Sequence, residues 1–118
     1  AGMNVNDDDF WKKMFPDLKT PDEMEEDLQA GVVRTREESE KFLQRLQELG
    51  REMKRARGEG ENDYNLIPRM HQIVRLVNRF MDNAHLEEEL DKNQRASCFE
   101  IIGEFDLNRK SRRRGMKQ

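Results

Sequence analysis

The side chains in this sequence that could perform nucleophilic catalysis are Cys98 and the two histidines, His71 and His85. A thiol becomes a nucleophile when a neighbouring histidine accepts its proton. Cys98, however, falls in one helical stripe with Phe99 and Ile102, a pattern typical of a buried and unreactive thiol. We interpret His71 as a residue on the surface or boundary of a helix. The sequence therefore predicts no nucleophile and base pair.

His85 has glutamates at i+3 and i+4, Glu88 and Glu89, and resembles half of a carboxylate–histidine metal site. Di-metal sites in helical bundles need two such units together with further glutamates, and no second unit is present in the sequence. There is also no cysteine pair for zinc and no glycine-rich phosphate loop. We therefore predict no metal, no cofactor, no small-molecule substrate and no enzymatic activity for this chain itself, although its parent protein could be an ATPase.

Positive charge is concentrated at the C-terminus. The formal net charge of the chain is −3, and six of its cations lie in residues 109–118, which contain no acid. Subtracting them leaves a net charge of about −9 on residues 1–108. The chain can therefore bind nucleic acid only through a segment in which positive charge is concentrated. Three interpretations stay open for this run: contact with nucleic acid, a nuclear import signal, or neither role. Its six cations are Arg109, Lys110, Arg112, Arg113, Arg114 and Lys117.

A second basic cluster lies at the end of the longest expected helix. Residues 34–57 hold eight basic and five acidic side chains. Basic residues in a last helical turn complement the helix dipole, which explains the cluster without a ligand. Phosphate contact is the functional alternative. The cluster consists of Arg51, Lys54, Arg55 and Arg57.

An aromatic segment lies near the N-terminus, where three aspartates precede it and Pro16 follows it. Acids at the start and proline at the end predict a helix of about two turns. A helix this short is unstable alone, so its apolar face must dock on the rest of the domain or on a partner protein. That face consists of Phe10, Trp11, Met14 and Phe15.

Two capping boxes predict the starts of the next helices. Thr20 with Glu23 opens a helix that ends near Gly31, and Thr35 with Glu38 opens a helix over about 36–57. We expect Asn65 to cap a fourth helix whose first turn contains Pro68.

The fourth helix has the most apolar face in the chain, which includes Val77 and Phe80, and should be central to the fold. We expect residues 82–107 to be helical, with a break near 91–93. One apolar stripe of that segment contains Leu86 and Leu90, and the other contains Cys98, Phe99, Ile102 and Phe105.

Composition limits the fold class, and the sequence contains no useful length of period-two alternation that would predict a strand. At 118 residues with 34% apolar and 40% charged side chains, the chain can form one domain in which each helix buries a single stripe. We predict an all-α, compact bundle of four to five helices, with the short aromatic helix at its start and a disordered basic tail. The expected divisions are a cloning remnant or disordered leader over 1–6, a bundle over 7–108 and the tail over 109–118. A single cysteine and the lack of a signal peptide or apolar span favour a reducing compartment and no membrane contact.

The acidic-then-aromatic element Asp7–Leu18 resembles the segment that follows the motor in chromodomain-helicase remodelling ATPases of the Snf2 type. Arg95–Phe99 resembles the start of the SANT-like helix of that family, although Glu100–Glu104 departs from the aromatic-rich continuation. The resemblance implies a nuclear, chromatin-associated parent protein with DNA as a partner.

The sequence thus predicts a non-catalytic interaction module with a protein partner and with nucleic acid as a secondary partner. The alternative is a cytosolic adaptor or structural bundle that binds a partner helix through its Phe10, Trp11 and Met14 face.

Overall fold

The computed structural model describes residues 4–60 and 63–106, and over these residues the chain is all-α, as predicted. The predicted basic tail lies outside the described residues. The described helices are α1 (Asp8–Met14), α2 (Pro21–Ala30), α3 (Arg36–Gly58), α4 (Asp63–Met81) and α5 (Lys92–Phe105).

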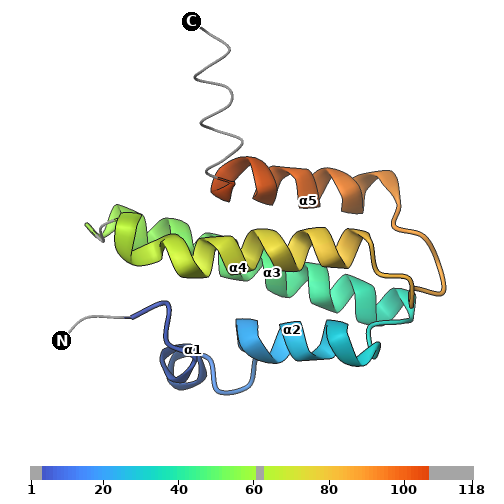
Figure 1. Ribbon diagram of the computed structural model, residues 1–118, viewed down its shortest axis with the longest axis horizontal. Coiled ribbons are helices and arrows are strands. Elements are labelled where there is room, and N and C mark those ends of the chain that lie inside the picture. The colour runs from blue at the N-terminus through green and yellow to red at the C-terminus, as the bar shows by residue number, and fades with distance from the viewer. Residues whose placement is uncertain (1–3, 61–62, 107–118) are drawn as a thin grey trace, which may run out of the picture.

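Helix α4 is the central element, which confirms the prediction from its apolar face. It packs against α2, α3 and α5, and α3 also contacts α5. In Figure 1, α3, α4 and α5 lie side by side and alternate in direction, while α1 lies across the N-terminal end of α2. The short connection between α3 and α4 favours their antiparallel arrangement.

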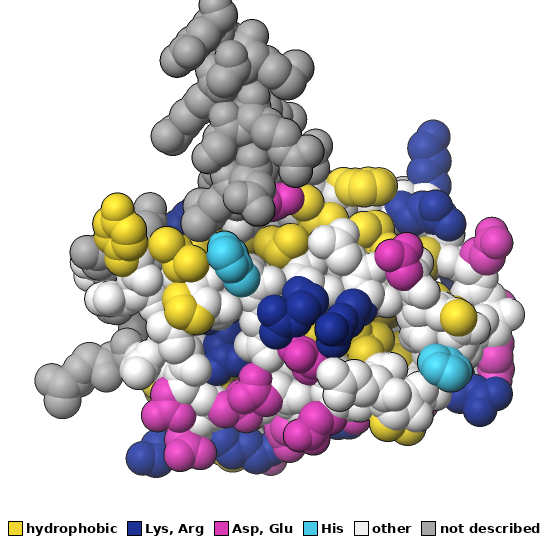
Figure 2. All heavy atoms as spheres, in the orientation of Figure 1, with side chains coloured by type: hydrophobic (Ala, Val, Ile, Leu, Met, Phe, Trp, Pro, Cys, Tyr) yellow, Lys and Arg dark blue, Asp and Glu magenta, His cyan; other side chains and the backbone are white. Residues whose placement is uncertain are grey.

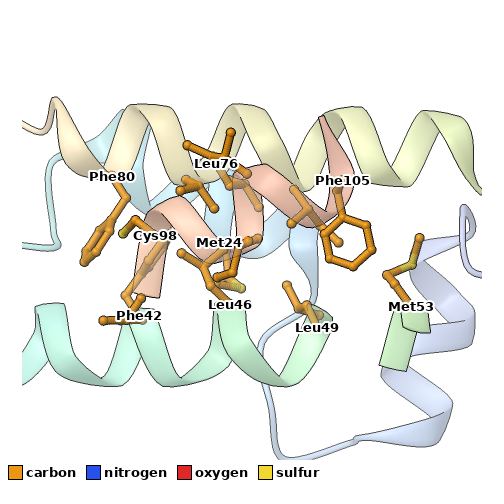
Figure 3. Close-up of a cluster of buried hydrophobic side chains, with 14 of the residues drawn as sticks. Met24, Phe42, Leu46, Leu49, Met53, Leu76, Phe80, Cys98 and Phe105 are labelled. Carbon is orange, nitrogen blue, oxygen red and sulfur yellow. The ribbon is translucent and has the colours of Figure 1, made fainter. Parts of the chain in front are cut away.

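The core lies where α2, α3, α4 and α5 meet, and Figure 3 shows its side chains projecting into the space between the helices. Val77 and Phe80 are fully buried, as predicted. The Phe80 ring stacks on Phe42 of α3, with ring centroids 5.0 Å apart and an interplanar angle of 16°. Such offset aromatic pairs add to the stabilisation that area burial already gives.

Both predicted capping boxes are present. The hydroxyls of Thr20 and Thr35 accept the backbone N–H groups of Glu23 and Glu38, whose carboxylates accept the cap N–H groups in return. Gly31 ends α2 in the left-handed conformation, with φ of +72°. Only glycine adopts this conformation without steric cost, which explains why the helix stops there.

The prediction of helix from residue 82 onward is wrong for 82–91. This segment forms turns, and α5 begins only at Lys92, behind a third capping box made by Asp91 and Gln94. The turns are held by tertiary hydrogen bonds: the Asn83 amide donates to the Val33 carbonyl at 2.8 Å, and the Glu87 N–H donates to the Arg34 carbonyl at 2.8 Å. These bonds replace the intrahelical ones that the periodicity suggested.

Two further predictions are corrected at the other end of the bundle. Asn65 is not a helix cap, because α4 already begins at Asp63. Residues 4–6 are not a detached leader: Val5 is buried, and the Asn6 side chain hydrogen-bonds to α4. The contacts of Val5 and Asn6 join distant parts of the chain, so no local pattern in the sequence reveals them.

Phe99 is also corrected, because 54% of its surface is exposed. The buried stripe of α5 instead consists of Cys98, Ile101, Ile102 and Phe105. This i, i+3, i+4, i+7 spacing is the one that a single helix face requires, and Phe99 lies beside it.

Candidate interaction surfaces

The aromatic face of α1 docks on its own domain, which was one of the two alternatives for it. Trp11 is fully buried, and its indole Nε1 donates to the Val5 carbonyl at 2.6 Å. Phe10 contacts the indole edge-on at 5.6 Å, and Phe15 stacks on it at 6.2 Å. Met14 alone of this face is largely exposed. In this conformation the Trp11 side chain is buried against its own domain.

The basic cluster at the end of α3 lies beside the C-terminal end of α5. Arg57 forms an ion pair with Glu104 at 3.0 Å, and its guanidinium lies 5.6 Å from the centre of the Phe105 ring. Lys54 reaches the same carboxylate at 3.9 Å. Arg57 thus joins two helices as well as supplying charge.

The remaining members of that cluster are more accessible. Arg55 lies between Glu52 and Glu59, at 3.2 and 3.8 Å, and Arg51 is exposed. Arg51 forms no ion pair with any residue in the described part of the chain. The other predicted phosphate contacts, Arg109, Lys110, Arg112, Arg113 and Arg114, lie outside the described residues.

A groove of about 740 Å³ follows the outer face of α4 and was not predicted. Arg75 and Arg79, one turn apart, both approach Glu25 of α2, at 2.8 and 3.8 Å. Figure 2 shows Lys and Arg side chains beside apolar ones on this face. The groove is lined by Leu28, Gln29, His71, Val74, Arg75, Asn78, Arg79, Asp82, Asn83, Ala84, His85, Phe105 and Asp106.

Glu25 is the charge that balances this pair of arginines. Partial burial of the Glu25 carboxyl acts to raise its pKa. Hydrogen bonds from Arg75 and Gln72, together with the positive charges of Arg75 and Arg79, have the larger effect, so the pKa is lowered. The i, i+4 spacing of Arg75 and Arg79 was visible in the sequence. Their shared carboxylate, fifty residues away, was not.

The two histidines are both visible on the face of the molecule shown in Figure 2. The imidazole of His85 lies against Gly31, where a Cβ added to the glycine would come within 3.0 Å of Nε2. Among the residues that the structure describes, no group of three or more histidine, cysteine, aspartate or glutamate side chains is placed to hold a metal ion.

Cys98 is fully buried among apolar side chains, and this burial raises the pKa of its thiol to about 11. The thiol therefore stays protonated near neutral pH, and the protonated form is a poor nucleophile.

Two arginines have largely buried guanidinium groups and structural roles that the sequence did not predict. Arg45 donates from Nε to the Lys19 carbonyl at 2.7 Å, and Arg69 donates from Nε to the Val5 carbonyl at 2.6 Å. Burial lowers the pKa of both groups, against the opposing effect of Glu48 near Arg45 and of Asp22 and Asp8 near Arg69. They hold chain segments in place and are not available to a ligand.

Comparisons of the chain with models of protein families, with curated proteins and with solved structures found no match. None of the helices in the described residues is both long enough and apolar enough to span a membrane.

Proposed function

We propose that this chain is a non-catalytic interaction module of a nuclear, chromatin-associated protein, and that it contacts nucleic acid through two basic segments. The segments are the end of α3, with Arg51, Lys54, Arg55 and Arg57, and residues 109–118.

The observation that supports this proposal is the position of the end of α3. Lys54 and Arg57 both pair with Glu104, so the basic end of α3 lies beside the last turn of α5. The basic run begins only five residues after Glu104. Two separate sources of positive charge thus start from the same end of an otherwise acidic body, where they can act on one stretch of phosphates.

The ion pairs of Lys54 and Arg55 leave these two side chains able to bind phosphate. The Lys54 and Arg55 side chains are more than half exposed. Exposed pairs of this kind contribute only about 0–1 kcal/mol, so a phosphate can replace the carboxylate at small cost. Arg51 has no ion pair within the described residues for a phosphate to replace.

The experiment is a titration of the full chain with duplex DNA at two salt concentrations. Three proteins are compared: the unmodified chain, Arg51→Ala/Lys54→Ala, and Arg112→Ala/Arg113→Ala/Arg114→Ala. Each substituted phosphate contact should make the slope of log affinity against log salt shallower by about 0.9.

A matched control is Lys13→Ala/Lys92→Ala, which removes the same number of charges as the α3 variant from exposed sites on α1 and at the start of α5. This control should change the overall affinity far less than the α3 variant. Failure of the unmodified chain to bind DNA at low salt would reject nucleic acid as a direct partner. The cytosolic adaptor that binds a partner helix would then be the better proposal, and Met14 is the exposed residue of the face predicted for it.

A further inference from the structure

The N-terminal segment is attached to α4 by the side chain of Asn6, which bonds to two backbone groups of the helix. In a regular α-helix the Arg69 N–H would donate to the Asn65 carbonyl. The Asn6 amide bonds to both of these groups: its Oδ1 accepts from the Arg69 N–H at 3.1 Å, and its Nδ2 donates to the Asn65 carbonyl. Pro68, one position earlier, has no N–H to contribute. The start of α4 therefore has one backbone donor fewer than a regular helix.

Val5 forms the second attachment. Its carbonyl accepts from both the Trp11 indole and the Arg69 guanidinium, each at 2.6 Å. Arg69 also lies 3.9 Å from Asp8 of α1 and 3.4 Å from Asp22 of α2. One buried arginine thus joins the N-terminal segment to the bundle.

The connection that follows α1 is fixed separately, on α3. The Arg45 guanidinium lies 5.3 Å from the centre of the Phe15 ring and donates to the Lys19 carbonyl at 2.7 Å. Residues 15–19 are therefore held even if the segment before them moves.

We propose that residues 4–14 form a latch that opens from the bundle as a unit, pivoting at residues 15–19, while α2, α3, α4 and α5 stay folded. The proposal rests on these intramolecular contacts and is independent of the proposed function.

Opening leaves few polar groups without partners. When Asn6 leaves, the Arg69 N–H and the Asn65 carbonyl can bond to each other as in any helix. Arg69 keeps Asp22 and Gln72 of the bundle. The seven-residue α1 has little stability of its own. Such a unit opens at lower free energy than the whole domain, and its opening exposes Trp11 and the surface beneath it.

Trp11 is the only tryptophan of the chain, so its fluorescence reports on the latch, whereas far-UV circular dichroism reports mainly on the longer helices. In urea, the fluorescence transition should precede the dichroism transition. Asn6→Ala should move the fluorescence midpoint to lower urea and leave the dichroism midpoint unchanged. Asn93→Ala, at an exposed position in the first turn of α5, is the matched control and should move neither.

Native-state hydrogen exchange tests the unmodified protein directly. The hydrogen-bonded Trp11 indole and the Phe15 amide should exchange at least tenfold faster than amides at residues 73–77 of α4. Equal exchange rates, or a joint shift of both urea transitions in Asn6→Ala, would overturn the latch.

Discussion

Two phenylalanines show that an apolar side chain is not always a buried one. Phe80 is fully buried and stacks on Phe42, whereas Phe99 lies mostly in solvent. Phe80→Ala should lower the free energy of unfolding by about 3–5 kcal/mol, because it leaves a cavity as well as losing transfer free energy. Phe99→Ala should change it by no more than about 0.5 kcal/mol. Urea unfolding of both variants measures the difference, and equal losses would contradict this assignment of the core.

Core residues at the centre of a stripe were predictable, and those at its edge were not. Val77 and Phe80 lie within the most apolar face, where a small rotation of the helix leaves them buried. On α5, Phe99 and Ile101 flank the stripe of Cys98, Ile102 and Phe105 on opposite sides, and only the packed neighbours decide which of the two is buried. The burial of Arg45 and Arg69 had no apolar signal, because their partners are backbone carbonyls of distant segments.

Helix starts are set by local chemistry. Thr20→Ala and Thr35→Ala should each lower the free energy of unfolding by about 0.5–2 kcal/mol, since each removes an acceptor for a first-turn N–H group. Thr20→Ser and Thr35→Ser retain the hydroxyl oxygen and serve as controls that should lose much less. Urea midpoints at a constant m-value measure the effect. Losses of equal size in the alanine and serine variants would show that the hydroxyl bond is not the cause.

Among the elements, those specified by neighbouring residues were predictable. The boxes at Thr20 and Thr35 are complete within four residues, and Gly31 ends α2 through its own backbone freedom. Residues 82–91 depend instead on Val33 and Arg34, which lie fifty residues earlier in the chain. The groove on α4 likewise needs Glu25 from another helix, so its geometry had no local signature.

At the scale of the whole molecule, we expect stability to depend on pH through three glutamates of the described residues, Glu23, Glu25 and Glu38. Accepting the backbone N–H groups of Thr20 and Thr35 lowers the pKa of Glu23 and Glu38, and the arginine contacts described above lower the pKa of Glu25 despite its burial. A lower pKa in the folded state means that the unfolded state binds protons first as the pH falls. The stabilisation is therefore present at neutral pH and is lost progressively below about pH 5.

Thermal unfolding at a series of pH values from 7 to 3 should show a falling melting temperature. Glu25→Gln should be less stable than the unmodified chain at pH 7 and should show a shallower decline toward pH 3. Glu26→Gln, at an exposed neighbouring position, is the matched control and should follow the unmodified profile. An identical decline in Glu25→Gln would exclude the Arg75 and Arg79 pairing as a contributor.

The contact of Gly31 with His85 makes two distant positions interdependent in sequence variation. A side chain at position 31 meets two separate obstacles: the positive φ of the helix end and the imidazole within 3.0 Å. Replacing His85 by a smaller residue removes the second obstacle and leaves the first. A smaller residue at position 85 should therefore allow further residue types at position 31. These are limited to residues that accept the left-handed conformation, such as asparagine.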